Sequence, residues 1–594
     1  MRKLSLHNIV LKIILGISLS YSVVSAEAQI NTDRMMLIGR NAMYYDDFAL
    51  SIQYFNQVID AKPHLHEPYF YRGLAKFYLE DYIGAENDCG KAIEINPYYS
   101  NSYEVRGLSR IKQEKYLLAA QDYEEATKLE FENKNIWNNL ILCYLQIDSI
   151  KQAHNAVDTF IQRWPKEADG YTMRSDVFLK ENDTIQAEQQ VDTALILDKY
   201  NNVALSMKAS FLMNREAFQD AESYLNESLR LQPNNTHNLI NRAMSRYHQD
   251  NYRGAMSDYD LALQIDSTNF IGHYNRGLLL AAVGEDNKAI EDFNYILSID
   301  PDDIMTLFNR ARLLDQTGDY KAAIRDYTTV IKEFPKFLYG YQLRAQARRK
   351  IGDIKGAMQD EEHILRENVA HRYGYSTPTS RMQNKTRKKS QIDPNDYEQL
   401  IEEEDNTRQY NDEYRGKIQN KSAEVRLLPI IVLAENSFDN DNSKLNEYMI
   451  EAYKLDKSVI DKFREGIECC INADDVRYSK DEKLHSSQFS LANAQYVKAA
   501  DAFTEVINKA PQFAEAYYNR AFIFAMQGDY ASAQKDLDMA IKRKSNFAQA
   551  YFNRGIVYAF MNNKQNSIED LSKAGELGIF SAYSIIKQQQ KKKK

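Results

Sequence analysis

The chain has 594 residues, with 75 Lys and Arg against 84 Asp and Glu, so its formal net charge is −9. A surface that binds nucleic acid needs a basic face or stripe, and this acidic balance argues against one. Tyr is abundant (41 residues) while Gly (22) and Pro (11) are sparse, as expected for stacked helices with aromatic side chains packed between them.

The first 28 residues have the pattern of a secretory signal. A positively charged start precedes an apolar run from Ile13 to Val24, which is too short to span a bilayer comfortably. Residues 26–28, Ala-Glu-Ala, fit a small-x-small cleavage site before Gln29. The sequence therefore predicts an exported, periplasmic chain that is cleaved between Ala28 and Gln29 and has no transmembrane span when mature. An uncleaved membrane anchor is the alternative.

A pattern with a period of 34 residues runs from residue 32 to residue 371 in ten consecutive registers. In the clearest register, Phe270 to Asp303, two short amphipathic helices are predicted on either side of a turn at Gly284. Position 8 of this register is Gly277 and position 20 is Ala289. The other registers carry small residues at position 20 and, with one exception, at position 8. Small side chains there let the backbones of the two helices approach closely, and a larger one would overpack the crossing.

This pattern resembles the tetratricopeptide repeat, a family of helix-turn-helix repeats of the same length. The resemblance implies an all-α fold, a right-handed superhelical solenoid of stacked helix pairs, here interrupted by a small insertion of uncertain structure. It also implies a protein-binding scaffold rather than an enzyme. The repeat pattern does not identify the partner, because function depends on the surface residues that the fold presents.

Eight repeats carry Arg at position 7 together with Asp at position 23. Folding the chain back at the turn brings these positions near each other, so the sequence predicts an ion pair that joins the two helices of each repeat. A row of charges that binds a ligand is the alternative. The pairs are Arg72 with Asp88, Arg106 with Asp122, Arg242 with Asp258, Arg276 with Asp292, Arg310 with Asp326, Arg344 with Asp360, Arg520 with Asp536, and Arg554 with Asp570.

The first helix of each repeat is expected to line an inner, concave face through positions 2, 5, 9, 12 and 13. These positions are mostly apolar or aromatic and would suit an extended or helical peptide segment. The alternative is that they pack between neighbouring helices. The candidate partner-binding residues are Phe70, Leu74, Phe77, Tyr78, Ile240, Met244, Tyr247, Ile271, Tyr274 and Leu278.

The period is lost after the tenth repeat. Residues 372–413 contain a basic run and an acidic run and are predicted to be a charged linker. Residues 414–479 combine a short strand-like stretch with a helical pattern and are predicted to be a small module of unknown fold. The repeats resume over residues 480–581 as three further copies. Residues 582–594 are predicted to form a closing helix and a Lys-rich tail.

The sequence contains no phosphate-binding Gly loop, no HExxH, no paired CxxC and no GxSxG motif. His64, His66 and Glu67 form the one tight cluster of potential metal ligands, but they lie at a repeat junction, where polar turn residues are ordinary. We therefore expect no catalytic residue, no metal and no cofactor.

These observations predict an exported, periplasmic scaffold or adaptor that binds protein or peptide segments of other envelope proteins. Its resemblance to envelope tetratricopeptide proteins of Gram-negative bacteria implies a role in assembling or coupling outer-membrane or secretion machinery. Two alternatives stay open. Residues 373–479 would be a ligand-binding or enzymatic module that the repeats carry, or the protein would be a cytosolic co-chaperone if the N-terminal segment is not cleaved.

Overall fold

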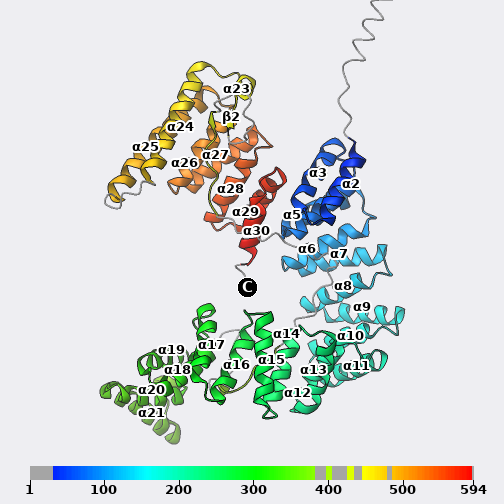
Figure 1. Ribbon diagram of the computed structural model, residues 1–594, viewed down its shortest axis with the longest axis vertical. Helices are drawn as coiled ribbons and strands as arrows, with labels where there is room; N and C mark the ends of the chain where they lie inside the picture. The colour runs from blue at the N-terminus through cyan, green and yellow to red at the C-terminus, as the bar shows by residue number, and fades with distance from the viewer. Residues whose placement is uncertain (1–30, 382–395, 404–424, 434–443, 478–484, 592–594) are drawn as a thin grey trace, which may run out of the picture. The chain divides into compact units, whose positions relative to one another are not determined.

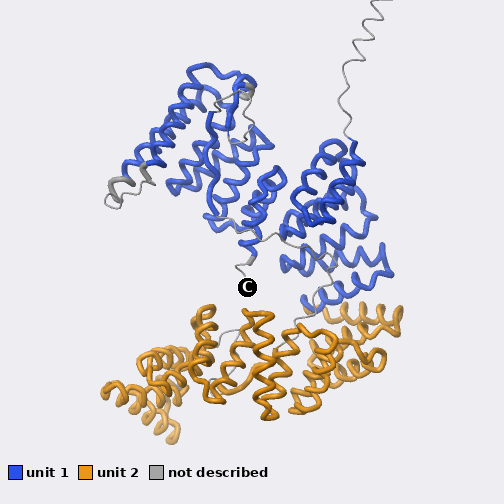
Figure 2. The backbone as a smooth tube through the Cα atoms, in the orientation of Figure 1, with its two compact units in different colours: residues 1–147, 410–594 blue, residues 148–409 orange. Residues whose placement is uncertain are grey.

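The computed structural model describes residues 31–381, 396–403, 425–433, 444–477 and 485–591. The chain divides into two units, residues 1–147 with 410–594 and residues 148–409 (Figure 2). Within each unit, consecutive helices pack in pairs (Figure 1), which confirms the predicted all-α repeat architecture. The predicted signal segment lies outside the described residues. In the ranges that are described, no helix has the length and apolar character needed to cross a membrane.

Unit 1 begins with three complete helix pairs and α8, and it ends with the C-terminal repeats. Its first helices are α2 (Thr32–Tyr44), α3 (Phe48–Ala61), α4 (Glu67–Tyr78), α5 (Tyr82–Ile95), α6 (Ser100–Lys112), α7 (Tyr116–Leu129) and α8 (Lys134–Gln146). Its later elements are β1 (Val432–Leu433), β2 (Lys444–Leu445), α23 (Glu447–Tyr453), α24 (Lys457–Arg477), α25 (His485–Lys509), α26 (Ala514–Met526), α27 (Tyr530–Arg543), α28 (Ala548–Phe560), α29 (Lys564–Glu576) and α30 (Ser581–Lys591). The two short strands pair in parallel, with Leu433 opposite Leu445.

Unit 2 consists of α-helices, turns and residues 396–403, which form no α-helix. Its helices are α9 (Ile150–Arg163), α10 (Ala168–Lys180), α11 (Thr184–Leu197), α12 (Asn202–Met213), α13 (Phe218–Leu231), α14 (Thr236–Tyr247), α15 (Tyr252–Ile265), α16 (Phe270–Ala282), α17 (Asp286–Ile299), α18 (Ile304–Thr317), α19 (Tyr320–Glu333), α20 (Leu338–Lys350), α21 (Ile354–Tyr373) and α22 (Pro378–Arg381).

A residue in the left-handed backbone region joins the two helices of each of the first ten repeats, always at position 15. Gly284, Gly318 and Gly352 have φ of 81°, 95° and 81° there. In the seven earlier repeats the residue is Asp, Glu or Asn, with φ between 52° and 62°. The residue that follows often caps the second helix; for example, the Asp319 carboxylate accepts a hydrogen bond of 3.1 Å from the Ala322 N–H. The turn therefore has the same geometry every 34 residues and keeps the helices in register.

The helices of a repeat cross where small and aromatic residues meet. A Cβ atom on Gly277 would lie 2.7 Å from Cε1 of Phe293, and Gly39 stands in the same relation to Phe55. Ala289, at position 20, is fully buried beside them. Any side chain at position 8 of these repeats would therefore force the aromatic ring or the backbones apart.

The first C-terminal repeat differs from its predicted boundaries. The sequence predicts a repeat from Lys480 to Phe513, but α25 occupies most of that range as one helix, and its packing partner is α24. A Cβ atom on Gly466 of α24 would lie 2.7 Å from Cε1 of Phe503 in α25, as one on Gly277 would from Phe293. Within residues 414–479, α24 therefore takes the place of the first helix of this repeat. The extra residues between the two helices interrupt the 34-residue period, so the sequence pattern did not indicate that α24 and α25 form a pair.

The C-terminal end of the repeats packs against the N-terminal repeats within unit 1. Ile585 and Ile586 of α30 are fully buried in one cluster with Phe48 and Ile52 of α3. Gly84 of α5 has no side chain at the point where Ser572 of α29 approaches, and a Cβ atom there would collide with the Ser572 hydroxyl. The predicted closing helix is thus itself covered by α3 to α5.

Buried charges lie at the centre of this contact. Lys76 of α4 is 1% exposed; its ammonium pairs with the Asp88 carboxylate at 2.8 Å and also with Glu576 of α29. The Glu576 backbone carbonyl accepts hydrogen bonds from the Asn56 and Gln53 amides at 2.8 and 3.0 Å. Because buried charges are tolerated only when they are paired, these contacts fix the orientation of α29 on the first repeats.

Asp81, the cap of α5, is buried beside this charge cluster, and its burial raises the pKa of its carboxyl to about 6, although Lys76 acts in the opposite direction. An acid whose folded pKa exceeds its unfolded value stabilises the fold fully below pH 4, and this contribution is lost as the pH rises through 6. Asp81→Asn keeps an acceptor for the Gly84 N–H and removes the charge. We expect the free energy of unfolding of the variant to exceed that of wild type by up to about 3 kcal/mol at pH 7. At pH 4 the two free energies should be equal.

Urea unfolding monitored by hydrogen exchange in α4 and α5 at both pH values measures this difference. Asp47→Asn, at the corresponding cap of α3, is the matched control. An equal change at pH 4 and pH 7 for Asp81→Asn would contradict the role of its burial.

Candidate peptide-binding faces

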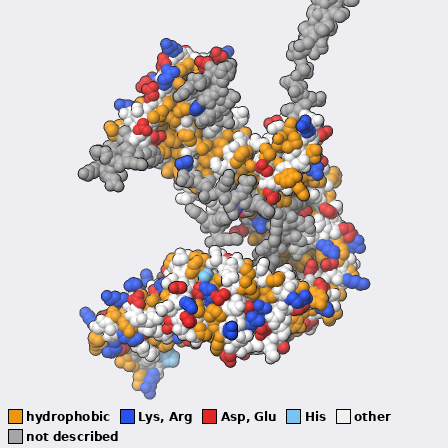
Figure 3. Space-filling view, in the orientation of Figure 1, with side chains coloured by type: hydrophobic (Ala, Val, Ile, Leu, Met, Phe, Trp, Pro, Cys, Tyr) orange, Lys and Arg blue, Asp and Glu red, His pale blue; other side chains and the backbone are white. Residues whose placement is uncertain are grey.

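Two short segments of the chain lie against the first helices of the repeats. The first begins with a turn, in which the Gln399 N–H donates to the Asp396 carbonyl at 3.0 Å, and the second ends in the strand β1. Segment A is residues 396–403, and it contacts face A, the side chains of α14, α16 and α18 in unit 2. Segment B is residues 425–433, and it contacts face B, the side chains of α26 and α28 in unit 1. In the view of Figure 3, hydrophobic side chains gather around α26 to α28. Both segments run in the direction opposite to the order of the repeats.

On face A, buried Asn side chains at position 6 of consecutive repeats bind the backbone of segment A. The Asn275 amide donates to the Ile401 carbonyl at 2.7 Å, and its oxygen accepts from the Ile401 N–H at 2.9 Å. Asn241 makes the same two bonds with Glu403, at 3.2 and 3.0 Å. An amide side chain supplies one donor and one acceptor, which matches the two polar groups of a single extended residue.

A third Asn and a Tyr complete the contact. Asn309 donates to the Tyr397 carbonyl at 2.7 Å and to the Tyr274 hydroxyl at 3.2 Å. The Tyr274 hydroxyl donates to the same Tyr397 carbonyl at 3.3 Å. Burial raises the pKa of Tyr274 well above its usual value, so this hydroxyl stays protonated and able to donate.

Face B repeats this arrangement with different residues. Asn553 binds the Leu428 carbonyl and N–H at 3.0 and 2.7 Å, and Asn519 binds those of Ile431 at 2.9 and 2.8 Å. The Tyr518 hydroxyl, like that of Tyr274, donates to the segment and accepts from the next Asn along the repeats. Both faces therefore bind the backbone of a segment through the same positions of the repeat.

Part of the predicted concave face takes part in these contacts. Met244, Tyr247, Tyr274 and Leu278 lie in one apolar cluster with Tyr397, Leu400 and Ile401 of segment A. Ile240 and Ile271 lie in the adjoining cluster between helices. Phe70, Leu74, Phe77 and Tyr78 pack with Val105 and Leu108 between α4, α5 and α6 instead, as the alternative of ordinary helix packing expects.

The Asn residues at position 6 were missed by the sequence analysis, which considered apolar and charged positions only. The signal is present, because an Asn-Arg dipeptide occupies positions 6 and 7 wherever a segment is bound. The residues are Asn241, Asn275, Asn309, Asn519 and Asn553.

The predicted Arg and Asp residues lie within bonding distance in all eight repeats. Each guanidinium donates at least two bonds to its carboxylate, at 2.9 and 2.5 Å for Arg72 and Asp88, 2.9 and 2.7 Å for Arg276 and Asp292, and 2.8 and 3.0 Å for Arg310 and Asp326. Each of these Asp side chains is buried, so the pairs join the helices inside the repeats rather than line face A.

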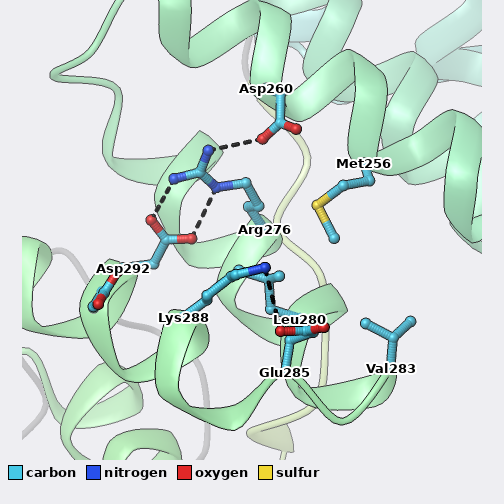
Figure 4. Close-up of a pocket in the computed structure, with 9 residues that line it drawn as sticks. Met256, Asp260, Arg276, Leu280, Val283, Glu285, Lys288 and Asp292 are labelled. Carbon is cyan, nitrogen blue, oxygen red and sulfur yellow. Dashed lines mark hydrogen bonds and ion pairs between the residues drawn. The ribbon is translucent and has the colours of Figure 1, made fainter.

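The same guanidinium also reaches the preceding repeat. Figure 4 shows Arg276 between Asp292 of its own repeat and Asp260 of the one before, which it contacts at 2.9 Å. An open pocket lies beside it, lined by Met256, Leu280, Val283 and the Glu285–Lys288 ion pair. Burial opposes ionisation of Asp292, but its bonds to His273 and Arg276 prevail and lower its pKa. The carboxylate is therefore held charged as a structural partner.

The described residues contain no group of three His, Cys, Asp or Glu side chains placed to hold a metal ion. The four Cys are free thiols. Burial raises the pKa of Cys89, Cys143 and Cys470, which keeps these thiols protonated and weakly reactive.

Family models of the tetratricopeptide repeat match residues 305–336, 502–535 and 548–577. No curated protein matches the chain. Solved structures that are similar include pilF of Pseudomonas aeruginosa, with 19% identity, a TM-score of 0.33, and coverage of 35% of this chain and 96% of that one. A MamA protein is 18% identical with a TM-score of 0.28, and the match covers 30% of this chain and 97% of that one. A tetratricopeptide repeat protein from Parabacteroides merdae is 16% identical with a TM-score of 0.25, and the match covers 66% of this chain and 97% of that one.

The two carboxylates on Arg276 give a matched test of the ion pairs. Asp292 is buried, whereas the Asp260 side chain is 50% exposed. We expect Asp292→Ala to destabilise α16 and α17 by about 3 kcal/mol, because it leaves a partly buried guanidinium short of a partner. Asp260→Ala should change their stability by about 0–1 kcal/mol. Hydrogen exchange of α16 and α17 in the full chain measures both, and equal effects would contradict a structural role for the buried pair.

The Asn contacts predict how strongly segment B is held. In the double variant Asn519→Ala, Asn553→Ala, the N–H groups of Leu428 and Ile431 lose their acceptors. We expect these two amides to exchange with solvent about ten-fold faster, in line with the loss of one net hydrogen bond each. Asn493→Ala, at an exposed site on α25, is the control. Unchanged exchange at Leu428 and Ile431 would show that apolar packing alone holds the segment.

Proposed function

Because this chain is a tetratricopeptide repeat protein, we propose that it is an exported scaffold that grips extended segments of other proteins through the position-6 Asn side chains of faces A and B. The observation that carries this proposal is the pair of hydrogen bonds that each Asn makes to one backbone residue. Such bonds use groups that every peptide has, so the same face accepts different sequences once a segment is extended.

Burial adds to the strength of these bonds. The five Asn side chains are at most 3% exposed, so a displaced segment would leave buried amide groups to be rehydrated or paired again. Buried polar groups without partners are unfavourable by about 1–3 kcal/mol each. A face of this kind therefore favours an occupied state, as a binding site for protein segments requires.

The alternative of a carried enzymatic or ligand-binding module within residues 373–479 draws no support from the described residues of that range. Segment A lies on face A, segment B on face B, and α24 pairs with α25. These described parts of the range therefore contact the repeats or form one of their helices.

Export follows in this proposal from the N-terminal signal pattern, and the partners are segments of other proteins of the periplasm or outer membrane, including assembly or secretion machinery. A cytosolic co-chaperone would keep its N-terminus.

Photo-crosslinking in intact cells tests both parts of the proposal. A crosslinking residue replaces Tyr339, which is 38% exposed and contacts Tyr397 at the end of face A. We expect crosslinks to a defined envelope protein, reduced at least about ten-fold by Asn275→Ala with Asn309→Ala, because two backbone contacts are lost. The same residue at Tyr98, 81% exposed in unit 1, is the control.

Mass spectrometry of the purified chain reads its N-terminus in the same experiment. A start at Gln29 supports export. An intact Met1 with cytosolic partners would overturn it, and crosslinks that do not depend on the Asn residues would overturn the binding mode.

A further inference from the structure

Segment A contacts face A through two of its side chains as well as through its backbone. Tyr397 packs against two apolar clusters, one of which it shares with Leu400, whereas the Glu398 side chain between them is 69% exposed. The two side-chain sites lie three residues apart along the segment, and Ile401 packs beside the second. Backbone bonds give this face its general affinity, and these two sites can give it a preference among sequences.

The Tyr397 site is built by α18 and α20. The Tyr397 ring lies edge-on to Phe308, with ring centroids 4.9 Å apart, and stacks near Tyr339 at 6.2 Å. The Arg312 guanidinium lies 4.3 Å from the Tyr397 ring centroid and pairs with Glu398 at 3.2 Å. A guanidinium over a ring and beside a carboxylate favours an aromatic residue followed directly by an acidic one.

The Leu400 site is deeper. Leu400 is 5% exposed and belongs to one buried cluster with Tyr274 and Leu278 of α16 and Met305 and Leu313 of α18. Full burial of a Leu side chain stabilises a contact appreciably, so this position selects an aliphatic residue. Together the two sites match the pattern aromatic, acidic, any residue, Leu, Ile.

Face B lacks this combination. Position 9, which is Arg312 on α18, is Phe522 on α26 and Ile556 on α28. Segment B presents Leu428, Pro429 and Ile430 there instead of an aromatic-acidic pair. The two faces thus hold the backbone alike and differ in the side chains that they accept.

Segment A is also separable from the helix pairs that bind it. It is in neither a helix nor a strand of the sheet, and the crossing of α16 and α17 is filled by Ala289 and Phe293 from within the repeat. A segment that is held by a few hydrogen bonds and two side chains can be exchanged for an equivalent one without unpacking the repeat.

We propose that segment A is an internal mimic of the partner of face A, which is a protein segment with an aromatic residue, an acidic residue, any residue, Leu and Ile in succession, the first two in a turn as Tyr397 and Glu398 are. This inference rests on the proposed function and specifies its partner. The partner displaces segment A, which competes at the high effective concentration of a tethered ligand.

The test uses a fluorescein-labelled peptide with the sequence of residues 396–403 and the full chain carrying Tyr397→Ser and Leu400→Ser. The control chain carries Leu365→Ser and Tyr375→Ser, two exposed residues of unit 2. Fluorescence anisotropy should show at least about ten-fold tighter binding to the first chain than to the control or wild type. Adding Asn275→Ala to that chain, or Tyr397→Ser to the peptide, should weaken binding by at least about the same factor.

Each other outcome overturns a distinct statement. Binding that ignores Tyr397→Ser in the peptide but needs Asn275 would remove the sequence preference and leave the proposed backbone recognition standing. No binding by the substituted chain, with circular dichroism equal to the control, would show that segment A is permanent packing. A dimer of wild type that Leu400→Ser alone dissociates would make the occupant a second copy of this chain. If the double variant loses helix content, Leu400→Ser alone serves as the substituted chain.

Discussion

The guanidinium at position 7 holds three helices together, and the binding faces depend on it. In the register of Arg276 it joins the first helix of the repeat to Asp292 of the second helix and to Asp260 of the preceding repeat. Neighbouring residues on a helix point about 100° apart. When the Arg is held in the junction between repeats, the Asn before it projects about 100° away from that junction. The ion pairs thereby align one amide from each repeat along face A.

This alignment explains how two faces with different linings bind their segments in the same way. Asn275 and Asn519 each contact one backbone residue through both polar atoms, although one holds Ile401 in an acidic segment and the other Ile431 in an apolar one. Backbone recognition is independent of sequence, so selectivity passes to the side-chain sites between the Asn residues. Arg312 with its neighbouring rings is such a site on face A, and face B has apolar residues in its place.

The end of the repeats in unit 1 follows a different principle. A terminal helix normally needs a polar outer surface, yet α30 buries Ile585 and Ile586 against the first repeats. The contact combines this apolar surface with Lys76, which is paired with Asp88 and Glu576. Apolar burial supplies most of the attraction, and the paired charges permit one orientation, because any other would leave a charge buried alone.

The sequence by itself determined everything that repeats within 34 residues. Helix α16 begins at Phe270 as expected, the turn falls at Gly284, and Arg276 lies at bonding distance from Asp292, because each of these contacts joins residues close in the chain and recurs in every copy. Only the tertiary structure decided which residues bind segments A and B, that α24 pairs with α25, and that α29 contacts α4 and α5. Asn275 and Ile401 are 126 residues apart, and Lys76 and Glu576 are 500 apart. Such contacts form once, between stretches with unrelated periods, and they exist only after the helices have stacked. The recurring Asn-Arg dipeptide marks the repeat side of the segment contacts, but no repeated pattern in the sequence marks the partner.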